Sequence, residues 1–269
     1  MQNYLKQYDS LFNKQYILNL NKEGKNLKQI SEILNIPVRR LGELVKYYDL
    51  NLNKRILYNV KHDFFEIIDS ELKAYILGFL VADGNISKKE GNRKQRISFN
   101  NAIDDYEILS LIQQNICPDT KIYFIDNQQG VIKRKLQCRL RFVSQQISDD
   151  LQQLNIIPNK TKNITFRMPV LKDIFLSHFI RGFFDGDGHV NKNCLTFVST
   201  SKKFLEDIAD YFKLPFRIIE EKNKSVYYRL CLNINKNTIH NIYDKLYKNS
   251  NYFLNRKKIK FNISNTEIN

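Results

Sequence analysis

One apolar stretch ending in Asp-Gly occurs twice in this chain, and this duplication constrains the fold more than any other feature. The first copy runs from Leu72 to Ile86, and the second runs from Phe175 to Val190. The aspartate of the second copy, Asp187, follows that of the first, Asp83, by 104 residues. This spacing is too long for a solenoid repeat, so it indicates two domain-sized halves.

Each copy is apolar nearly all the way round, which is typical of a buried helix. Gly78 and Ala82 lie four residues apart, as do Gly182 and Gly186, so small residues share one face of each helix. Small residues at this spacing let two helix backbones approach closely. We therefore predict that the two helices pack against each other along these faces.

An aspartate ends each helix, where negative charge is unfavourable. Asp83 and Asp187 fall in the last turn, where the helix dipole costs an exposed acid about 0.3–1 kcal/mol. Gly84 and Gly188 then stop the helices, as glycines just past a helix end usually do. Two acids on touching helices also repel each other, so the pattern favours a compensating cation over two ordinary Asp-Gly turns. Carboxylates suit Mg²⁺, which bridges to phosphate, and two such ions can act on the attacking and leaving oxygens of a phosphodiester.

The two copies resemble the LAGLIDADG motifs of the homing endonucleases. They read Ile-Leu-Gly-Phe-Leu-Val-Ala-Asp-Gly at residues 76–84 and Ile-Arg-Gly-Phe-Phe-Asp-Gly-Asp-Gly at residues 180–188. The resemblance covers roughly residues 62–260, and it is specific because both copies keep the final Asp-Gly at domain-half spacing. It implies an α+β fold, in which two pseudo-symmetric αββαββα halves form a DNA-binding saddle.

One position departs from the family pattern. Val81 stands where the second copy has an acid, Asp185. The family's catalytic acid is the last aspartate, so the resemblance implies catalytic and metal-binding roles for Asp83 and Asp187 in spite of Val81. A calcium loop that starts at Asp185 is disfavoured, because its twelfth position is Thr196 and such a loop needs a glutamate there. The predicted metal site comprises Asp83, Asp187, Gly84 and Gly188.

The charge of the chain favours a polyanionic partner. Its 269 residues include 43 Lys and Arg against 28 Asp and Glu, a net charge of +15, which points to nucleic acid or an anionic membrane surface. No run approaches the roughly eighteen apolar residues of a membrane span. The first residues are too polar for a signal peptide, and the four scattered cysteines fit core thiols of a reducing compartment. We therefore expect an intracellular protein, in a cytoplasm, nucleoid or organelle matrix, that is not secreted.

Three short helices are predicted near the N-terminus, at 11–20, Leu27–Leu34 and Val38–Tyr47. Asn26 can cap the second helix and Pro37 can start the third. The second and third helices resemble the helix-turn-helix family, which implies that the third lies in the DNA major groove. A protein-binding helical cap is the alternative. The residues predicted to contact DNA are Arg39, Arg40, Glu43 and Lys46.

After each motif helix the pattern becomes strand, strand, helix, strand, strand, helix. The strands predicted in the first half are 86–87, 96–101, 121–126 and 131–142, and the helices are 104–115 and 144–154. The strands predicted in the second half are 190, 195–199, 216–221 and 226–232, and the helices are 202–212 and 236–247. The predicted domains are 1–60 for the helix-turn-helix-like domain and its connector, 61–165 for the first half and 166–269 for the second.

The strand predicted at 131–142 is the most informative one. Its residues alternate between cationic or polar and mainly apolar, so a period of two places one kind on each face. A face that meets only solvent usually mixes charge signs, whereas this face has no acid, which favours contact with DNA phosphates and base edges. The residues of this face are Lys133, Lys135, Gln137, Arg139 and Arg141. Two similar polar faces are predicted to contact DNA, with Arg96, Ser98 and Asn100 in the first half and Tyr227, Arg229 and Asn233 in the second.

A basic turn follows the last helix of each half, at residues 157–161 and 254–258. Both turns resemble the family's basic turn that returns toward the active site, where a lysine near the scissile phosphate polarises the site or stabilises charge. The resemblance implies this catalytic role for Lys160 and Lys257, with Lys258 as a second option. Phosphate contacts outside the active site are the alternative.

The resemblance as a whole implies a site-specific homing endonuclease. It would be a Mg²⁺-dependent monomer that hydrolyses one phosphodiester in each strand of double-stranded DNA at a long asymmetric target. Its role would be to spread an intron or another mobile genetic element, and an intein is disfavoured because flanking splicing residues are absent. Two other classes stay open. One is a non-cutting transcription regulator, which would be expected to lose one or both acids, and the other is an RNA maturase that binds its own intron RNA.

Overall fold

The computed structural model describes residues 13–23, 25–50, 52, 59–91, 93–126, 136–158, 163–191, 193–222 and 226–261. The chain separates into two compact units, Met1–Tyr58 and Asn59–Asn269. Within the described residues, no helix is both long and apolar enough to cross a membrane. The predicted Lys133, Lys135 and Lys160 lie outside the described residues.

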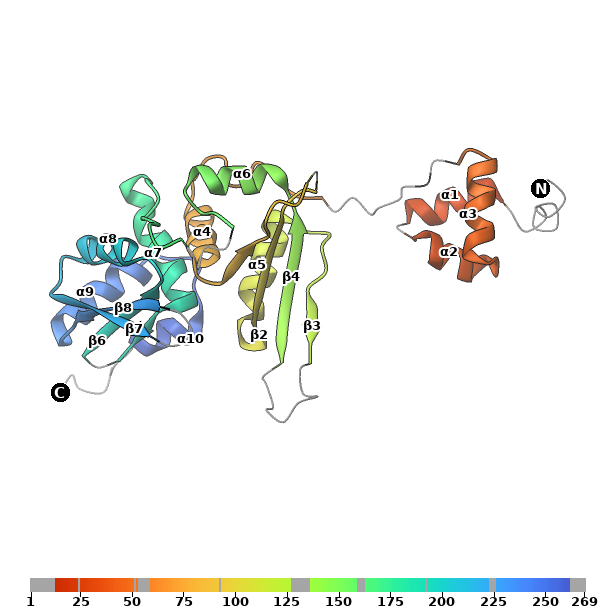
Figure 1. Ribbon diagram of the computed structural model, residues 1–269. Coiled ribbons are helices and arrows are strands. Elements are labelled where there is room, and N and C mark those ends of the chain that lie inside the picture. Colours follow the sequence, from red (N-terminus) through yellow and green to blue (C-terminus); the bar gives the residue numbers. More distant parts are fainter. Residues whose placement is uncertain are drawn as a thin grey trace. The chain divides into compact units, whose positions relative to one another are not determined.

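Three helices make up the described part of the first unit, namely α1 (Lys14–Lys22), α2 (Leu27–Leu34) and α3 (Val38–Tyr47) (Figure 1). Asn26 and Gln29 begin α2 with a reciprocal capping box, and Asn35, with a left-handed φ of 51°, turns the chain toward α3. Helices α2 and α3 have the predicted bounds, whereas α1 starts later than predicted because Asn13 caps it. The unit has a core of its own, formed by Ile17, Leu20, Ile30, Ile36, Leu41, Leu44 and Leu52.

Each half of the second unit begins with a long motif helix and continues with an antiparallel sheet. The first half comprises α4 (Glu71–Asp83), β1 (Gly84–Ile86), β2 (Arg96–Ala102), a 3₁₀ turn (Ile103–Asp105), α5 (Tyr106–Ile116), β3 (Tyr123–Ile125), β4 (Gln137–Val143) and α6 (Gln145–Gln153). The second half comprises α7 (Asp173–Asp187), β5 (His189–Val190), β6 (Cys194–Ser199), α8 (Lys202–Phe212), β7 (Phe216–Lys222), β8 (Val226–Asn233) and α9 (Lys236–Tyr247). A short helix α10 (Asn255–Lys258) and a 3₁₀ turn (Ile259–Phe261) follow.

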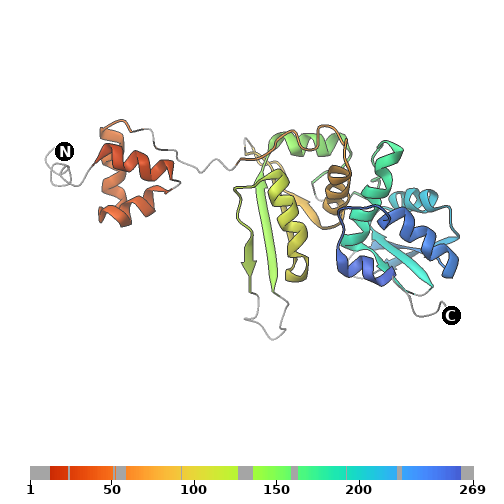
Figure 2. The same ribbon diagram turned by 180° about the vertical axis from the view of Figure 1, so that it is seen from behind.

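The two sheets have the same strand order, β1-β2-β4-β3 and β5-β6-β8-β7, and their strands are antiparallel (Figures 1 and 2). The side-chain packing repeats as well. Phe79 of α4 stacks on Phe99 of β2 with ring centroids 6.3 Å apart, and Phe183 of α7 stacks on Phe197 of β6 at 6.2 Å. The predicted α+β class, with two alike halves and N-terminal helices, is therefore confirmed.

Helices α4 and α7 pack directly against each other, as the small residues predict. A Cβ added to Gly78 would lie 1.9 Å from the backbone oxygen of Phe179, and one added to Gly182 would lie 2.0 Å from that of Tyr75. No side chain fits in such a gap, because ordinary Cβ contacts are 3.4–4 Å. The two backbones therefore touch along a glycine seam, which fixes the mutual position of the two helix ends.

Gly84 and Gly188 end these helices, but not as left-handed caps. Their φ angles are −75° and −86°, and their backbones are extended. The reason for glycine is space. A Cβ on Gly84 would lie 2.7 Å from the Leu80 oxygen, and one on Gly188 would lie 2.1 Å from a ring carbon of Phe184. The glycines therefore let each chain turn straight from helix to strand.

Candidate active site and nucleic-acid interface

The two predicted catalytic acids, Asp83 and Asp187, are the last residues of α4 and α7. Gly186, which precedes Asp187, packs against the end of α4. A Cβ on Gly186 would lie 2.3 Å from the Cβ of Ala82 and 3.3 Å from Oδ2 of Asp83. The seam therefore brings both acids to adjoining helix ends, where the two helix dipoles disfavour their negative charges.

Asn101 holds Asp83 in place, a contact that we did not predict. Its Nδ2 donates to Oδ2 of Asp83 at 2.8 Å. The Asn101 side chain is buried, and its Oδ1 has no hydrogen-bond partner in the described part of the chain. The sequence does contain a signal, because Asn101 is a polar residue at a core-facing position of an alternating strand, after the buried Ile97 and Phe99.

The donors at these helix ends fit a divalent cation that takes other ligands from its surroundings. Asp83 and Asp187 offer hard carboxylate oxygens, and the Oδ1 of Asn101 is a further oxygen that a hydrated ion would satisfy. Among the described residues, no cluster of three or more acidic, His or Cys side chains could enclose a metal. This set suits Mg²⁺, which is usually held by one or two carboxylates together with waters and substrate phosphates.

Lys257 of α10 reaches the end of α7, beside Asp187. It is only 6% exposed, and its Nζ donates to the backbone oxygen of Gly188 and, at 3.5 Å, to that of Gly186. Burial and the nearby charge of Arg256 lower the pKa of Lys257 to about 8, against the opposing charges of acids that include Asp187. A cation of the chain itself thus offsets the negative end of the α7 dipole.

Lys257 contacts one of the residues of the predicted metal site. The Gly188 carbonyl, predicted as a metal ligand, accepts a hydrogen bond from the Lys257 ammonium group. Lys258 has its Nζ 3.9 Å from the ring centroid of Phe253. Of the two lysines considered in this turn, Lys257 is therefore the one whose ammonium group is held at the end of α7.

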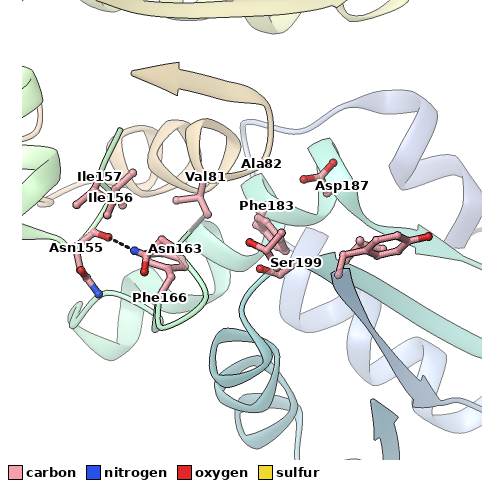
Figure 3. Close-up of a pocket in the computed structure, with 13 residues that line it drawn as sticks. Val81, Ala82, Asn155, Ile156, Ile157, Asn163, Phe166, Phe183, Asp187 and Ser199 are labelled. Atoms are coloured by element: carbon pink, nitrogen blue, oxygen red, sulfur yellow. Dashed lines mark hydrogen bonds between the residues drawn. The ribbon is translucent and has the colours of Figure 1, made fainter. Parts of the chain in front are cut away.

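A cavity of about 200 Å³ opens beside Asp187 (Figure 3). Val81 and Ala82 of α4 and Phe183 of α7 contribute apolar side chains to its lining. Among its described lining residues, Asp187 is the only charged one. Val81, the residue that departs from the family pattern, thus faces a cavity, whereas its counterpart Asp185 is fully buried.

Strand β4 carries the part of the predicted cationic face that the structure describes. Its core-facing residues are Cys138, Leu140 and Phe142, and the opposite face has Gln137, Arg139 and Arg141. Arg139 Nε donates to Oδ1 of Asn100 on the paired strand β2. Burial and the charges of Arg139 and Arg96 lower the pKa of Arg141. Three guanidinium groups therefore gather on one face of the first sheet, where they repel one another in the absence of an anion.

One residue predicted on this face, Ser98, is largely covered by its neighbours. Arg96 and Asn100 are exposed, but Ser98 is only 5% exposed. Ser98 is covered because it pairs with Asn85 on one side and with Arg141 on the other. Ser98 therefore lies on the predicted face with little exposed surface, and its contact with DNA stays a prediction.

The corresponding face of the second sheet is less basic. Tyr227, Arg229 and Asn233 alternate along β8 with the buried Leu230 and Leu232. Arg229 Nη2 lies 3.1 Å from Oε1 of Glu221 on the neighbouring strand β7. The acid offsets part of the positive charge, so the two sheets differ in their attraction for a polyanion.

In the first unit, the predicted contact residues lie together on α3. Arg39 is 88% exposed, and Glu43 pairs with Arg39 at 3.4 Å and with Arg40 at 2.7 Å. The hydrogen bond from Arg40 contributes most to lowering the pKa of Glu43 below its ordinary value. Lys46 follows in the last turn of the helix. Glu43 therefore holds the two arginines, an arrangement that orients them along the helix surface.

Comparisons with known proteins agree with this architecture. Residues 175–247 match the model of the LAGLIDADG-like domain family, and no curated protein matches the chain in sequence. The homing endonuclease I-WcaI, solved bound to its DNA recognition sequence, has a similar structure. It is 15% identical to this chain, with a TM-score of 0.50 over 80% of this chain and 96% of that one. I-DmoI, solved in complex with DNA and Mn, is 16% identical over 68% of this chain and 98% of that one, with a TM-score of 0.44.

The domain match falls on the second motif and its sheet, and the first half repeats the same strand order and the same stacked phenylalanine pair. The structural similarity to I-WcaI extends over both halves. The chain therefore carries a LAGLIDADG-like domain at residues 175–247 and has the fold of the LAGLIDADG homing endonucleases.

Proposed function

We propose that this protein is a site-specific endonuclease that cuts both strands of double-stranded DNA with the help of a divalent metal, Mg²⁺ by preference. The observation that supports the proposal most strongly is the meeting of Asp83 and Asp187 at the adjoining ends of α4 and α7. Two acids at helix C-termini cost stability, so their placement fits a site built for cations and phosphate.

The residues at the helix ends would have different roles in cleavage. Asp83 and Asp187 would hold Mg²⁺, which when bound lowers the pKa of water and stabilises developing negative charge. Asn101 orients the Asp83 carboxylate through its Nδ2. The Lys257 ammonium group would add positive charge next to the scissile phosphate on the Asp187 side, where preorganised donors stabilise a transition state most effectively.

Binding would rest on the cationic face of β2 and β4 and on the helix α3. Arg96, Arg139 and Arg141 would neutralise backbone phosphates, and Gln137 would be available to base edges. The first unit would add contacts to DNA beyond those that the two halves make. Because both motifs lie in one chain, we propose a monomer that takes a long asymmetric target, as expected of a mobile-element nuclease inside a DNA-containing compartment.

The proposal can be tested without knowledge of the target. The full chain is incubated with Mg²⁺ and a library of randomised duplexes, and the cut ends are sequenced. We expect one family of related sequences with breaks at fixed positions in both strands. Enrichment of bound but uncut duplexes would contradict the nuclease and favour a regulator, and the rescue of intron splicing without DNA cleavage would favour a maturase.

Substitution of either acid tests the role of the helix ends. Asp83→Asn and Asp187→Asn should each lower the rate of double-strand cleavage by about a thousandfold, the equivalent of roughly 4 kcal/mol of transition-state stabilisation. DNA binding should change little, because the cationic face is untouched. The matched control is Asp69→Asn, since Asp69 is exposed near the opposite end of α4 and pairs only with Lys73 among the ion pairs seen there. Full cleavage by both acid variants would remove the assignment.

A further inference from the structure

The segment Asn251–Lys258, here called the C-terminal strap, belongs to the second half but is anchored on residues of both halves. At its start, the Asn251 amide and side chain donate to the two carboxylate oxygens of Glu71, each at 2.8 Å. Near its end, Arg256 makes a bidentate pair with Asp105, with Nε–Oδ1 at 2.6 Å and Nη2–Oδ2 at 2.8 Å. Glu71 and Asp105 both belong to the first half.

Between these two anchors, Asp185 holds the middle of the strap. Its Oδ2 accepts from the Leu254 amide at 2.7 Å and from the Tyr75 hydroxyl at 2.8 Å, and its Oδ1 accepts from the Tyr247 hydroxyl at 2.6 Å. Asp185 is fully buried, and both of its carboxylate oxygens accept hydrogen bonds from the protein. It precedes the predicted catalytic acid Asp187 by two residues, yet its contacts are those of an anchor and not of a ligand for phosphate or metal.

The anchored strap determines where Lys257 lies. Leu254, whose amide Asp185 holds, is the residue that precedes α10, and its backbone oxygen accepts from the Lys257 amide at 2.9 Å. Arg256, held by Asp105, is the neighbour of Lys257 in the same short helix. With α10 fixed at both points, the Lys257 ammonium group reaches the Gly188 carbonyl at the end of α7.

The first motif lacks the middle anchor. The counterpart of Asp185 is Val81, which is apolar and lines the cavity beside Asp187. An arrangement in which a buried carboxylate holds a strap is therefore built into only one of the two motif helices. Any dependence of catalysis on this anchor should accordingly fall on one strand of the substrate more than on the other.

We propose that Asp185 and Asp105 are positioning residues, which act through the C-terminal strap to keep Lys257 beside Asp187 and so make the cut of one DNA strand depend on contacts from both halves. The proposal deepens, and rests on, the proposed endonuclease function. It assigns Asp185 and Asp105 no contact with substrate, and it predicts unequal effects on the two strands.

The first test does not involve DNA. Surface lysines of the folded protein are acetylated with a small amine reagent, and the rate at Lys257 is followed by mass spectrometry. In the parent protein Lys257 should react slowly, because it is 6% exposed. In Arg256→Ala, Asp105→Asn and Asp185→Asn, the rate at Lys257 should rise by roughly tenfold, with other lysines unchanged. An unchanged rate in folded variants would overturn the proposal.

Arg167→Ala is the matched control. Arg167 makes a comparable pair with Asp207, with Nε 3.0 Å from Oδ2 of Asp207, but away from the strap. Its loss removes the same kind of ion pair and should leave Lys257 protected. If Asp185→Asn does not fold, Arg256→Ala still decides the matter, because the Arg256 side chain is 42% exposed and its loss leaves the core intact.

The second test uses a duplex that the parent protein cuts, labelled on both strands. At saturating protein, the strap variants should slow one strand by roughly 10- to 100-fold, as expected for misplacement of a catalytic group, while the other strand changes less than about threefold. Nicked duplex should then accumulate, and Arg256→Lys should restore part of the lost rate. Equal slowing of both strands would reduce Asp185 and Asp105 to a general structural role. If the parent protein cuts no duplex, the proposed function fails, while the acetylation result still decides whether the strap positions Lys257.

Discussion

Arg181 is a charged side chain buried at the interface of the two motif helices, with 1% exposure. Its guanidinium group donates to the backbone oxygens of Tyr252 and Leu246 at 2.8 and 2.7 Å, and to Oε1 of Glu71 at 2.7 Å. A buried charge persists only where partners replace its lost hydration. Glu71 is therefore a central residue of this region, because it binds both Arg181 and the start of the C-terminal strap.

Replacement of Glu71 by Gln should destabilise the protein in a pH-dependent way. Burial alone would raise the pKa of Glu71, but hydrogen bonds from Asn251 and the charge of Arg181 outweigh it and lower the pKa below its ordinary 4.5. A lowered pKa means that the carboxylate stabilises the fold above about pH 4.5 and loses this effect as the pH falls through the folded-state value. Urea unfolding should show a loss of about 1–3 kcal/mol for Glu71→Gln at pH 7, and this loss should shrink as the pH falls below about 4.5. A constant difference at every pH would show that the charge of Glu71 is not what stabilises the fold.

The residues of the candidate site divide into those that a sequence pattern can reveal and those that it cannot. Asp83 and Asp187 could be predicted, because their motif is local and repeated. The Asp105–Arg256 pair could not, because 151 positions separate its members and nothing in the basic turn that holds Arg256 points to Asp105 as its partner. Asn101 is an intermediate case. The sequence shows a polar residue at a core-facing strand position, but it does not show that this residue binds Asp83.

At the level of elements, the glycine seam between α4 and α7 sets the geometry of the site. Gly78→Ala and Gly182→Ala should each cost about 3 kcal/mol or more, because the added methyl group would overlap a backbone oxygen of the other helix. The control is Gly42→Ala in α3, where the nearest atom would be 3.7 Å away. That change should stabilise the protein by about 0.5–1 kcal/mol, since alanine is the better helix former. Chemical denaturation of the three variants measures both effects, and a harmless Gly182→Ala would contradict the seam.

Element bounds could be predicted best where side chains mark them. Helices α2, α8 and α9 begin as predicted after Asn26, Ser201 and Asn235, each of which caps the first turn. The extended conformation of Gly84 and Gly188 could not be predicted, because glycine after a helix favours a left-handed cap and only tertiary crowding requires the other choice. The burial of Ser98 likewise depends on its cross-strand neighbours and not on its own strand.

At the level of the whole molecule, the two units have separate hydrophobic cores. Deletion of residues 1–58 should therefore leave a folded protein that still cuts DNA. Its DNA affinity should fall, and the slope of log K against log salt should become shallower by about 0.9 for each phosphate that the shortened chain no longer neutralises. Fluorescence anisotropy over a salt series, with thermal unfolding as the check on folding, measures the effect. An unfolded truncated chain would show that the first unit is part of the core fold.

The duplication is also what made the overall fold accessible from the sequence. Two apolar helices with matched small residues predict a shared seam, and the repeated strand pattern predicts two alike sheets. The asymmetry between the halves is harder to predict from the sequence. The two motifs differ at the position of Val81 and Asp185, but the strap that Asp185 anchors lies about 70 residues further along the chain.

We propose that Asp83 and Asp187 form one cation site where α4 and α7 meet. Anomalous diffraction from a crystal of the protein with its selected duplex and Mn²⁺ tests whether this site binds a cation. Mn²⁺ is a close substitute for Mg²⁺ at carboxylate and phosphate oxygens. We expect anomalous peaks at bonding distance from both carboxylates, next to the DNA backbone. Peaks elsewhere, or two carboxylates pointing away from the bound duplex, would contradict it.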